Sequence, residues 1–450
     1  MLRANGGGTL ATETEKIAAR ASSAHPEAMP ILSRRTLIAA TAALPLLNAA
    51  AILRAAEPDL SGLRDLTTGV VSIGTAERTA RIARAQQLMR RHGLSAVVIE
   101  PGASLTYFTG VRWGRSERIT AAVLPVEGEA LIVTPFFEEP SVRETLGIPA
   151  TVRVWQEDES PHALIAGWLR ERRLARGRLG IEETARFFVA DGLAARLPGM
   201  TLGSANRVVR GCRMIKTPAE LALMQAATDV TTAAYRWTWP RAEPGMTGGE
   251  VSALMNAATR KLGGDPEFAL ALVGEASAYP HGSREVHRLG KDGGPGAVLL
   301  MDCGCAVQGY QSDVSRTFVK GRPSAEVARV FDHVRQGQQI ALAAARIGTP
   351  AGRVDDAVRG QYEAWGYGPR YQLPGTSHRT GHGIGMDGHE PVNLVHGEAT
   401  PLAAGMCFSN EPGIYLPGRF GVRLEDCFHM TTDGPRWFST PPRWLDAPLG

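Results

Sequence analysis

Two apolar, strand-like runs that each meet an aspartate constrain this chain most. The run Ala297 to Met301 ends at Asp302, and the run Val314 to Val319 follows directly after Asp313. A turn at Gly309 would pair the two runs as neighbouring strands. Carboxylates held side by side would repel each other and lose solvation, unless a cation neutralised them. The pair therefore indicates a metal site or, as such pairs more often do, a solvated hairpin edge.

Three histidines lie close together in a Gly-rich segment farther along the chain. They are His378, His382 and His389, and the glycines between them permit tight turns around a site. Imidazole is a common metal ligand and also titrates near neutral pH. Taken singly, each histidine is more typical of a core or surface position.

Two glutamates follow, each between turn residues and strand-forming residues. Glu411 stands in Asn410-Glu411-Pro412-Gly413-Ile414-Tyr415, and Glu425 stands in Gly421-Val422-Arg423-Leu424-Glu425-Asp426. The order Asp, Asp, His, Glu, Glu with these flanking residues resembles the five-ligand signature of the creatinase/prolidase/methionine aminopeptidase family. The resemblance extends from about Arg213 to the end of the chain.

This resemblance implies an α/β (α+β) fold, with a creatinase-like α/β domain followed by a pita-bread metallohydrolase domain. It implies a metal-ligand set of Asp302, Asp313, His382, Glu411 and Glu425, none of which is substituted. Four carboxylates balance the charge of two divalent ions, which can then hold a bridging hydroxide. Mixed oxygen and nitrogen ligands suit manganese, cobalt, zinc or iron, and the sequence does not choose among them.

The resemblance also implies roles for residues beside the metals. His281 would hold or protonate the leaving group, His389 would stabilise the oxyanion, and Glu411 would carry the proton between nucleophile and leaving nitrogen. His378 would line the substrate pocket, and Arg423 would support the site electrostatically.

The expected activity is that of an Xaa-Pro aminopeptidase, which removes the N-terminal residue ahead of proline from a peptide substrate. Some prolidase relatives hold a dipeptide's carboxylate with an arginine upstream of the Glu-Pro-Gly segment, yet no Arg or Lys occurs between Thr380 and Pro417. Two alternatives remain: a creatinase-like or ectoine-hydrolase-like enzyme that cleaves a small amide, and a non-enzymatic binding protein on the same fold. The family suggests a homodimer or homotetramer.

The length of 450 residues favours two domains and a processed segment. We divide the chain into a signal region (1–56), a linker (57–78), an N-terminal domain (79–207) and a catalytic domain (208–450). Helix-like, strand-like and hairpin-like patterns fill the N-terminal domain, including a turn at Glu127-Gly128. Capping boxes at Thr217 and Thr247 predict the starts of two helices in the catalytic domain.

The N-terminal segment resembles a twin-arginine export signal, because Arg34 and Arg35 precede a weakly apolar run from Leu37 to Leu53. Pro45 and several polar residues make this run a poor membrane span, so we expect cleavage near residue 56 and a periplasmic protein. A chance arginine pair and an uncleaved anchor are the alternatives. Met29 would give a signal of more usual length.

Composition limits the partners. The net charge of +4 is spread along the chain without a basic block, which argues against nucleic-acid binding. Five cysteines are few and odd in number, so we expect mostly buried thiols rather than a disulfide framework.

Overall fold

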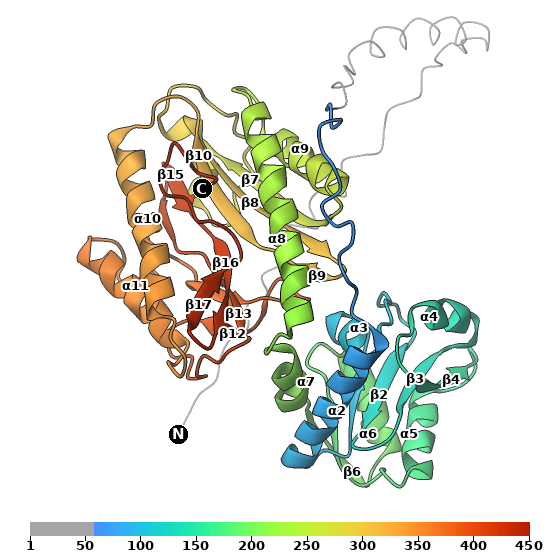
Figure 1. Ribbon diagram of the computed structural model, residues 1–450. Coiled ribbons are helices and arrows are strands. Elements are labelled where there is room, and N and C mark those ends of the chain that lie inside the picture. The colour runs from blue at the N-terminus through green and yellow to red at the C-terminus, as the bar shows by residue number, and fades with distance from the viewer. Residues whose placement is uncertain (1–57) are drawn as a thin grey trace, which may run out of the picture. The chain divides into compact units, whose positions relative to one another are not determined.

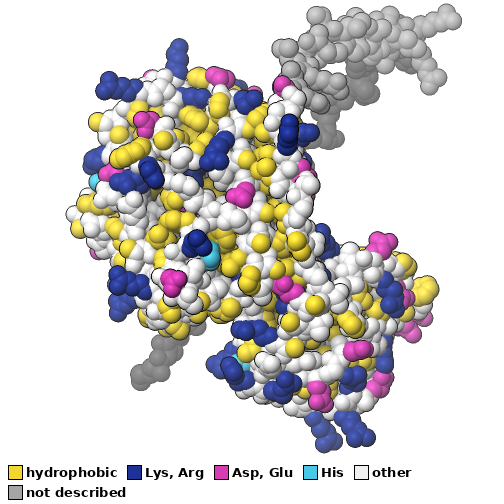
Figure 2. Space-filling model, viewed as in Figure 1, with side chains coloured by type: hydrophobic (Ala, Val, Ile, Leu, Met, Phe, Trp, Pro, Cys, Tyr) yellow, Lys and Arg dark blue, Asp and Glu magenta, His cyan; other side chains and the backbone are white. Residues whose placement is uncertain are grey.

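A computed structural model describes residues 58–450 (Figure 1). The predicted export signal lies outside the described residues. No helix in residues 58–450 is long and apolar enough to cross a membrane. Basic and acidic side chains are scattered over the face seen in Figure 2, where neither sign forms a continuous block.

The first part of the chain builds one sheet with helices around it. The sheet has six strands in the order β4-β3-β2-β1-β5-β6. Its strands are β1 (Ala96–Ile99), β2 (Ala121–Pro125), β3 (Ala130–Pro135), β4 (Ala150–Trp155), β5 (Gly177–Ile181) and β6 (Met200–Ser204). The helices are α2 (Thr75–His92), α3 (Ala103–Thr109), α4 (Glu139–Thr145), α5 (Pro161–Glu171), α6 (Phe187–Arg196) and α7 (Asn206–Arg213), with a 3-10 turn η2 (Phe136–Glu138). The predicted hairpin is confirmed, because β2 and β3 pair antiparallel.

Helix α7 belongs to the core of this first sheet. Val208, Val209 and Cys212 are buried and pack with Ala85 and Met89 of α2. The core of the N-terminal sheet thus draws on residues up to Cys212. The division of the chain at residues 207 and 208 stays a prediction.

The second part begins with two capped helices on a sheet. α8 (Pro218–Thr238) and α9 (Gly248–Lys261) both start in a complete capping box, as predicted. They pack against β7 (Asp265–Val273) and β8 (Val298–Val307), which form a sheet with β10 (Val314–Val319) and the short β9 (Tyr310–Gln311). Short 3-10 turns, η3 (Trp239–Arg241), η4 (Gly274–Ala278) and η5 (Pro295–Ala297), connect them.

The predicted turn between Asp302 and Asp313 is confirmed. Val307 pairs with Tyr310 across Gln308 and Gly309, both of which have positive φ, and β8 then pairs antiparallel with β10.

The last part packs two helices on a second sheet. This sheet has five strands in the order β12-β11-β13-β16-β17, and β14 and β15 form a separate hairpin. The strands are β11 (Gly381–Gly383), β12 (Glu390–Leu394), β13 (Cys407–Asn410), β14 (Gly413–Leu416), β15 (Phe420–Arg423), β16 (Asp426–Thr431) and β17 (Gly434–Trp437). Helices α10 (Ala325–Ala344) and α11 (Gly352–Ala364) cover it, so the strands lie between two helix pairs (Figure 1).

All five cysteines are free and buried, as expected from their number.

Candidate metal centre

Each predicted ligand lies in or beside a strand of the two sheets. Asp302 lies within β8 and Asp313 directly precedes β10, while His382 lies in β11. Glu411 follows β13, and Glu425 stands between β15 and β16. The strand pairing that folds the two sheets therefore carries side chains from distant parts of the chain to one place.

The five side chains form overlapping groups whose ligand atoms all lie within 4.8 Å of one another. One group is Asp302, Asp313 and Glu425, and another is His382, Glu411 and Glu425. A third joins Asp313 and His382 to His389. Because Glu425 belongs to two groups, its carboxylate connects them.

Burial makes this cluster unfavourable without a cation. Burial raises the pKa of Asp313 well above its usual range, and the charges of Asp302 and Glu411 raise it further. The pKa of Glu425 is raised in the same way, by burial and then by Asp313, Glu411 and Asp302. Oε1 of Glu425 is buried and has no hydrogen-bond partner among the described residues. A divalent metal ion would meet both demands, because it neutralises the carboxylates and coordinates the free oxygen.

His382 lies next to two of the carboxylates in the cluster. His382 Nε2 lies 3.2 Å from Glu411 Oε1 and 3.7 Å from Asp313 Oδ2. Burial opposes ionisation of Glu411, but the hydrogen bond and charge of His382 outweigh it and lower the pKa of this carboxyl. His382 is thus in place as a nitrogen ligand next to the carboxylates.

Two further predicted histidines border the cluster. The His389 ring lies 3.9 Å from the His382 ring, centroid to centroid, and is exposed. Although His389 is exposed, the surrounding protein removes part of the water around its ring, and this desolvation with the charges of His382 and Arg379 lowers its pKa to about 4. His378 Nδ1 lies 3.8 Å from Glu411 Oε2, and its Nε2 is 2.8 Å from the Tyr415 hydroxyl.

Arg423 is buried beside the cluster, whereas His281 is exposed. Arg423 Nη2 donates to Asp302 Oδ2 at 2.6 Å, and Nη1 donates to the Tyr415 hydroxyl at 3.1 Å. The same guanidinium donates to the carbonyl of Pro280 at 3.1 Å, which ties the His281 loop to the site. His281 itself is exposed.

Sequence reasoning missed several polar neighbours. Ser315 Oγ lies 2.8 Å from Asp302 Oδ1 and 2.7 Å from Glu425 Oε2. Strand alternation places Ser315 on the same face as Asp313, a signal that would have found it. Tyr415 lies in the quoted Glu411 segment, yet no spacing rule singles out its hydroxyl.

Arg379 directly precedes Thr380, so it lies just outside the segment between Thr380 and Pro417 that contains no Arg or Lys. Its Nη1 donates to Asn393 Oδ1 at 2.7 Å, and its Nη2 lies 3.4 Å from His389 Nδ1. Arg379 and His389 line a cavity of about 340 Å³. Glu182 and Glu183, which directly follow β5 of the first sheet, line it too.

Comparison with known proteins agrees with this architecture. Residues 222–432 match the model of metallopeptidase family M24, and residues 81–215 match the creatinase/prolidase N-terminal domain. An uncharacterized peptidase of Schizosaccharomyces pombe is 32% identical over 405 residues, which are 85% of this chain and 86% of the relative.

Solved structures are similar across both parts. The dipeptidase PepE from Mycobacterium ulcerans aligns with a TM-score of 0.75 and 32% identity, covering 83% of this chain and 99% of that one. A recombinant prolidase from Thermococcus sibiricus aligns with a TM-score of 0.74 and 28% identity, covering 82% and 98%. The predicted fold, a creatinase-like domain followed by a pita-bread domain, is confirmed.

Proposed function

Because this chain belongs to metallopeptidase family M24, we propose that it hydrolyses short peptides at the bond that precedes proline, with two divalent metal ions. The observation that carries the proposal is the cluster of four acidic side chains and one imidazole, in which a buried Glu425 oxygen has no partner among residues 58–450. That the chain is a peptidase rests on its membership of family M24.

Asp302, Asp313 and Glu425 would hold one ion, and His382, Glu411 and Glu425 would hold the other. Four carboxylates offset two divalent ions, so the loaded site is close to neutral. Bound metal would polarise the scissile carbonyl and supply a nucleophilic water at neutral pH.

The neighbouring side chains would bind the substrate and move the proton. His389, at the exposed rim of the cluster, would donate a hydrogen bond to the developing oxyanion. Glu411 would carry the proton of the attacking water to the leaving nitrogen, and His281 would hold that nitrogen. His378, held by Tyr415, would line the substrate pocket, while Arg423 would fix Asp302.

Two substrate lengths are compatible with this chemistry. An Xaa-Pro aminopeptidase, our expectation from the sequence, accepts peptides longer than two residues. An Xaa-Pro dipeptidase is the second candidate, and Arg379 favours it, because this guanidinium borders the His389 cavity where it could bind a dipeptide's carboxylate. The solved relatives named above are a dipeptidase and a prolidase, which supports the same candidate.

A substrate panel tests the proposal. The metal-reconstituted protein is assayed with Xaa-Pro dipeptides, Xaa-Pro tripeptides, Xaa-Ala controls, creatine and an acyl-diaminobutyrate. We expect cleavage of prolyl peptides only. Equal cleavage of Xaa-Ala peptides would remove the proline claim, and cleavage of the small amides alone would favour the creatinase-like or ectoine-hydrolase-like alternative.

The variant Arg379→Gln separates the two peptide lengths. For a dipeptidase we expect KM for the dipeptide to rise about tenfold or more, since a charge-assisted hydrogen bond contributes about 1.5–3 kcal/mol. Arg210→Gln is the matched control, because Arg210 lines the same cavity but pairs with Glu183. If a tripeptide is hydrolysed faster than the dipeptide, and Arg379→Gln changes neither rate, the aminopeptidase is favoured.

A further inference from the structure

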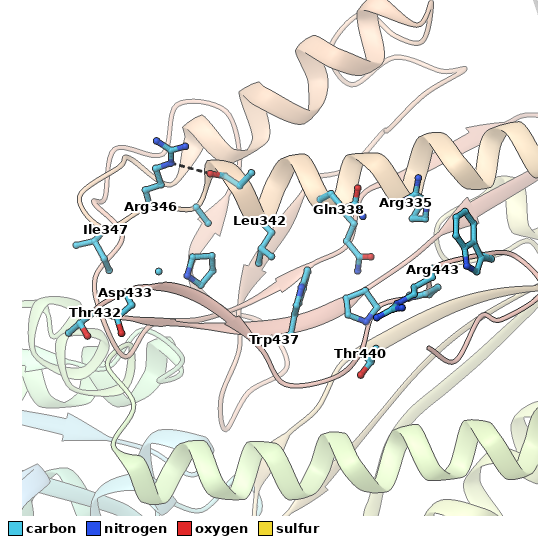
Figure 3. A pocket seen from close by; sticks show the side chains of 18 residues that line it. Arg335, Gln338, Leu342, Arg346, Ile347, Thr432, Asp433, Trp437, Thr440 and Arg443 are labelled. Carbon is cyan, nitrogen blue, oxygen red and sulfur yellow. Dashed lines mark hydrogen bonds between the residues drawn. The ribbon is translucent and has the colours of Figure 1, made fainter.

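A second cavity lies between helix α10 and strand β17, apart from the candidate metal centre. It has a volume of about 910 Å³, and Figure 3 shows its lining. Helix α10 forms one wall, and β17 with the segment 440–444 forms the other. None of its lining residues is a candidate metal ligand, so the groove is a site separate from that of the proposed hydrolysis. Its size is that of pockets that bind small organic ligands, about 300–1,000 Å³.

The middle of this groove is apolar. Leu342 projects from α10 and Trp437 from β17 toward the same space (Figure 3). Ile347 and Trp444 line it too and are 47% and 65% exposed. Large hydrophobic side chains left open around one cavity are typical of a surface that binds a ligand.

An acidic and a basic side chain without ion pairs among residues 58–450 lie toward opposite ends of the groove. Figure 3 shows Asp433 near one end and Arg443 toward the other, with Trp437 between them. Asp433 and Arg443 are both exposed, and neither has an ion-pair partner among residues 58–450. By contrast, Arg335 on the same groove is paired with Asp332 at 2.6 Å. Arg346 also lines the groove, and its Nε donates to the carbonyl of Ala343 at 3.3 Å.

The floor is held rigidly from behind. Gln338 is 1% exposed, and its Nε2 donates to Asp426 Oδ2 at 2.8 Å and to the carbonyl of Asn410 at 3.3 Å. Asn410 Nδ2 in turn donates to the Gln338 carbonyl at 2.9 Å. Because these hydrogen bonds already hold Gln338, this part of the floor loses little conformational entropy when a ligand binds.

We propose that this groove is a second binding site, which takes a short free peptide with apolar side chains. The peptide's ammonium would pair with Asp433, its carboxylate with Arg443, and its side chains would cover Leu342 and Trp437. A ligand charged at one end only would leave the other charge unused, whereas a peptide with free termini matches both. The charge-assisted pairs and the apolar burial would act together.

Calorimetric titration of the metal-loaded protein tests the site. The probe is an apolar tetrapeptide of leucine and alanine with free ends, in which an uncleavable ketomethylene group replaces the first peptide bond. We expect one binding event, at the groove, because the probe lacks the proline that the proposed catalytic site requires. The same probe with an acetylated N-terminus and an amidated C-terminus should bind the groove at least tenfold more weakly.

Variants assign this binding event to the groove. Arg443→Gln and Asp433→Asn should each weaken it about tenfold or more, and both are surface changes. Arg436→Gln is the matched control, because Arg436 is an exposed arginine of β17 outside the groove lining. The absence of any binding event in the parent protein, or an event that neither variant changes, would overturn the proposal. Loss of peptidase activity on all substrates would bear on the proposed function and not on this site.

Discussion

Ser315 shows how much of the site depends on single uncharged side chains. Its hydroxyl lies between one oxygen of Asp302 and one of Glu425, and it accepts a hydrogen bond from Arg423 Nε at 2.8 Å. Groups that orient metal ligands in this way commonly change metal affinity or activity by about 10- to 100-fold when removed. We therefore propose that Ser315 orients both carboxylates for metal binding.

Replacing this hydroxyl tests that role. We expect Ser315→Ala to weaken Mn²⁺ binding by about tenfold or more and to lower kcat, because two carboxylates lose their common partner. Metal titration by calorimetry and steady-state kinetics measure the two effects. Ser312→Ala is the control, since the buried Ser312 hydroxyl bonds to Cys305 and Thr231 instead. Equal metal affinity in both variants would contradict the assignment.

Glu390 provides a pH-dependent contribution to stability. It is buried and pairs with Lys216 at 2.9 Å and with Arg213. Burial opposes its ionisation, but Lys216 and Arg213 outweigh burial and lower its pKa from 4.5 to about 2. A lowered pKa stabilises the fold above pH 4.5, and this stability is lost as the pH falls toward 2.

We expect Glu390→Gln to lower the free energy of unfolding by about 3 kcal/mol at pH 7, which is what a shift of this size represents. The difference from the parent should shrink as the pH falls below 4.5. Urea unfolding between pH 7 and pH 3 measures it. Glu183→Gln, which breaks a more exposed pair with Arg210, should cost less than about 1 kcal/mol. A difference from the parent that stays constant down to pH 3 would be inconsistent with the pairing.

At the residue scale, the sequence supplied the ligand candidates but not their surroundings. Asp302 and Glu425 were identified because their flanking segments are recognisable, and the structure brings both into one cluster. The hydroxyls of Ser315 and Tyr415 lie beside the cluster because of the way in which their strands pair. The role of Ser315 and Tyr415 in orienting the ligands, like the ligand role of the five side chains, stays a prediction.

At the element scale, a buried ion pair connects the elements that carry the ligands. Arg316 of β10 and Asp426 of β16 are 1% and 0% exposed and lie 2.6 Å apart. Arg316 Nη1 also donates to the carbonyl of Glu425 at 2.7 Å, and Gln338 of α10 donates to Asp426. Three elements are thus fixed directly behind the metal cluster.

Removing one member of this ion pair should destabilise the fold. We expect Asp426→Asn to lower the free energy of unfolding by about 3–5 kcal/mol, because a buried guanidinium loses its carboxylate. Adding Arg316→Met should recover part of the loss. Urea unfolding in the presence of a chelator separates this effect from metal binding. A double variant no more stable than Asp426→Asn would contradict the explanation.

Local elements were predictable, and long-range pairing was not. The capping boxes at Thr217 and Thr247 and the hairpin at Glu127-Gly128 involve residues near in sequence, and all three are confirmed. The sheet order β12-β11-β13-β16-β17 depends on contacts between distant segments, for which single-chain patterns carry no direct signal. Family resemblance supplied that part of the fold.

At the scale of the whole molecule, export by the twin-arginine route stays a proposal. A reporter fused to the N-terminal segment should be exported when Arg34 and Arg35 are present and retained when both are changed to Lys. A Lys substitution elsewhere in residues 1–56 is the control. Unchanged export of the double-lysine fusion would remove the signal assignment. A homodimer or homotetramer is likewise a prediction, which sedimentation would check.

We propose that hydrolysis depends on metal ions held by five side chains, Asp302, Asp313, His382, Glu411 and Glu425. The most direct measurement is elemental analysis of the protein, paired with its Xaa-Pro hydrolysis rate, before and after chelation. We predict two divalent ions per chain in the parent, fewer in Glu425→Gln, and a rate that falls with metal content and returns on reconstitution. A metal-free protein that hydrolyses at the full rate would contradict the claim.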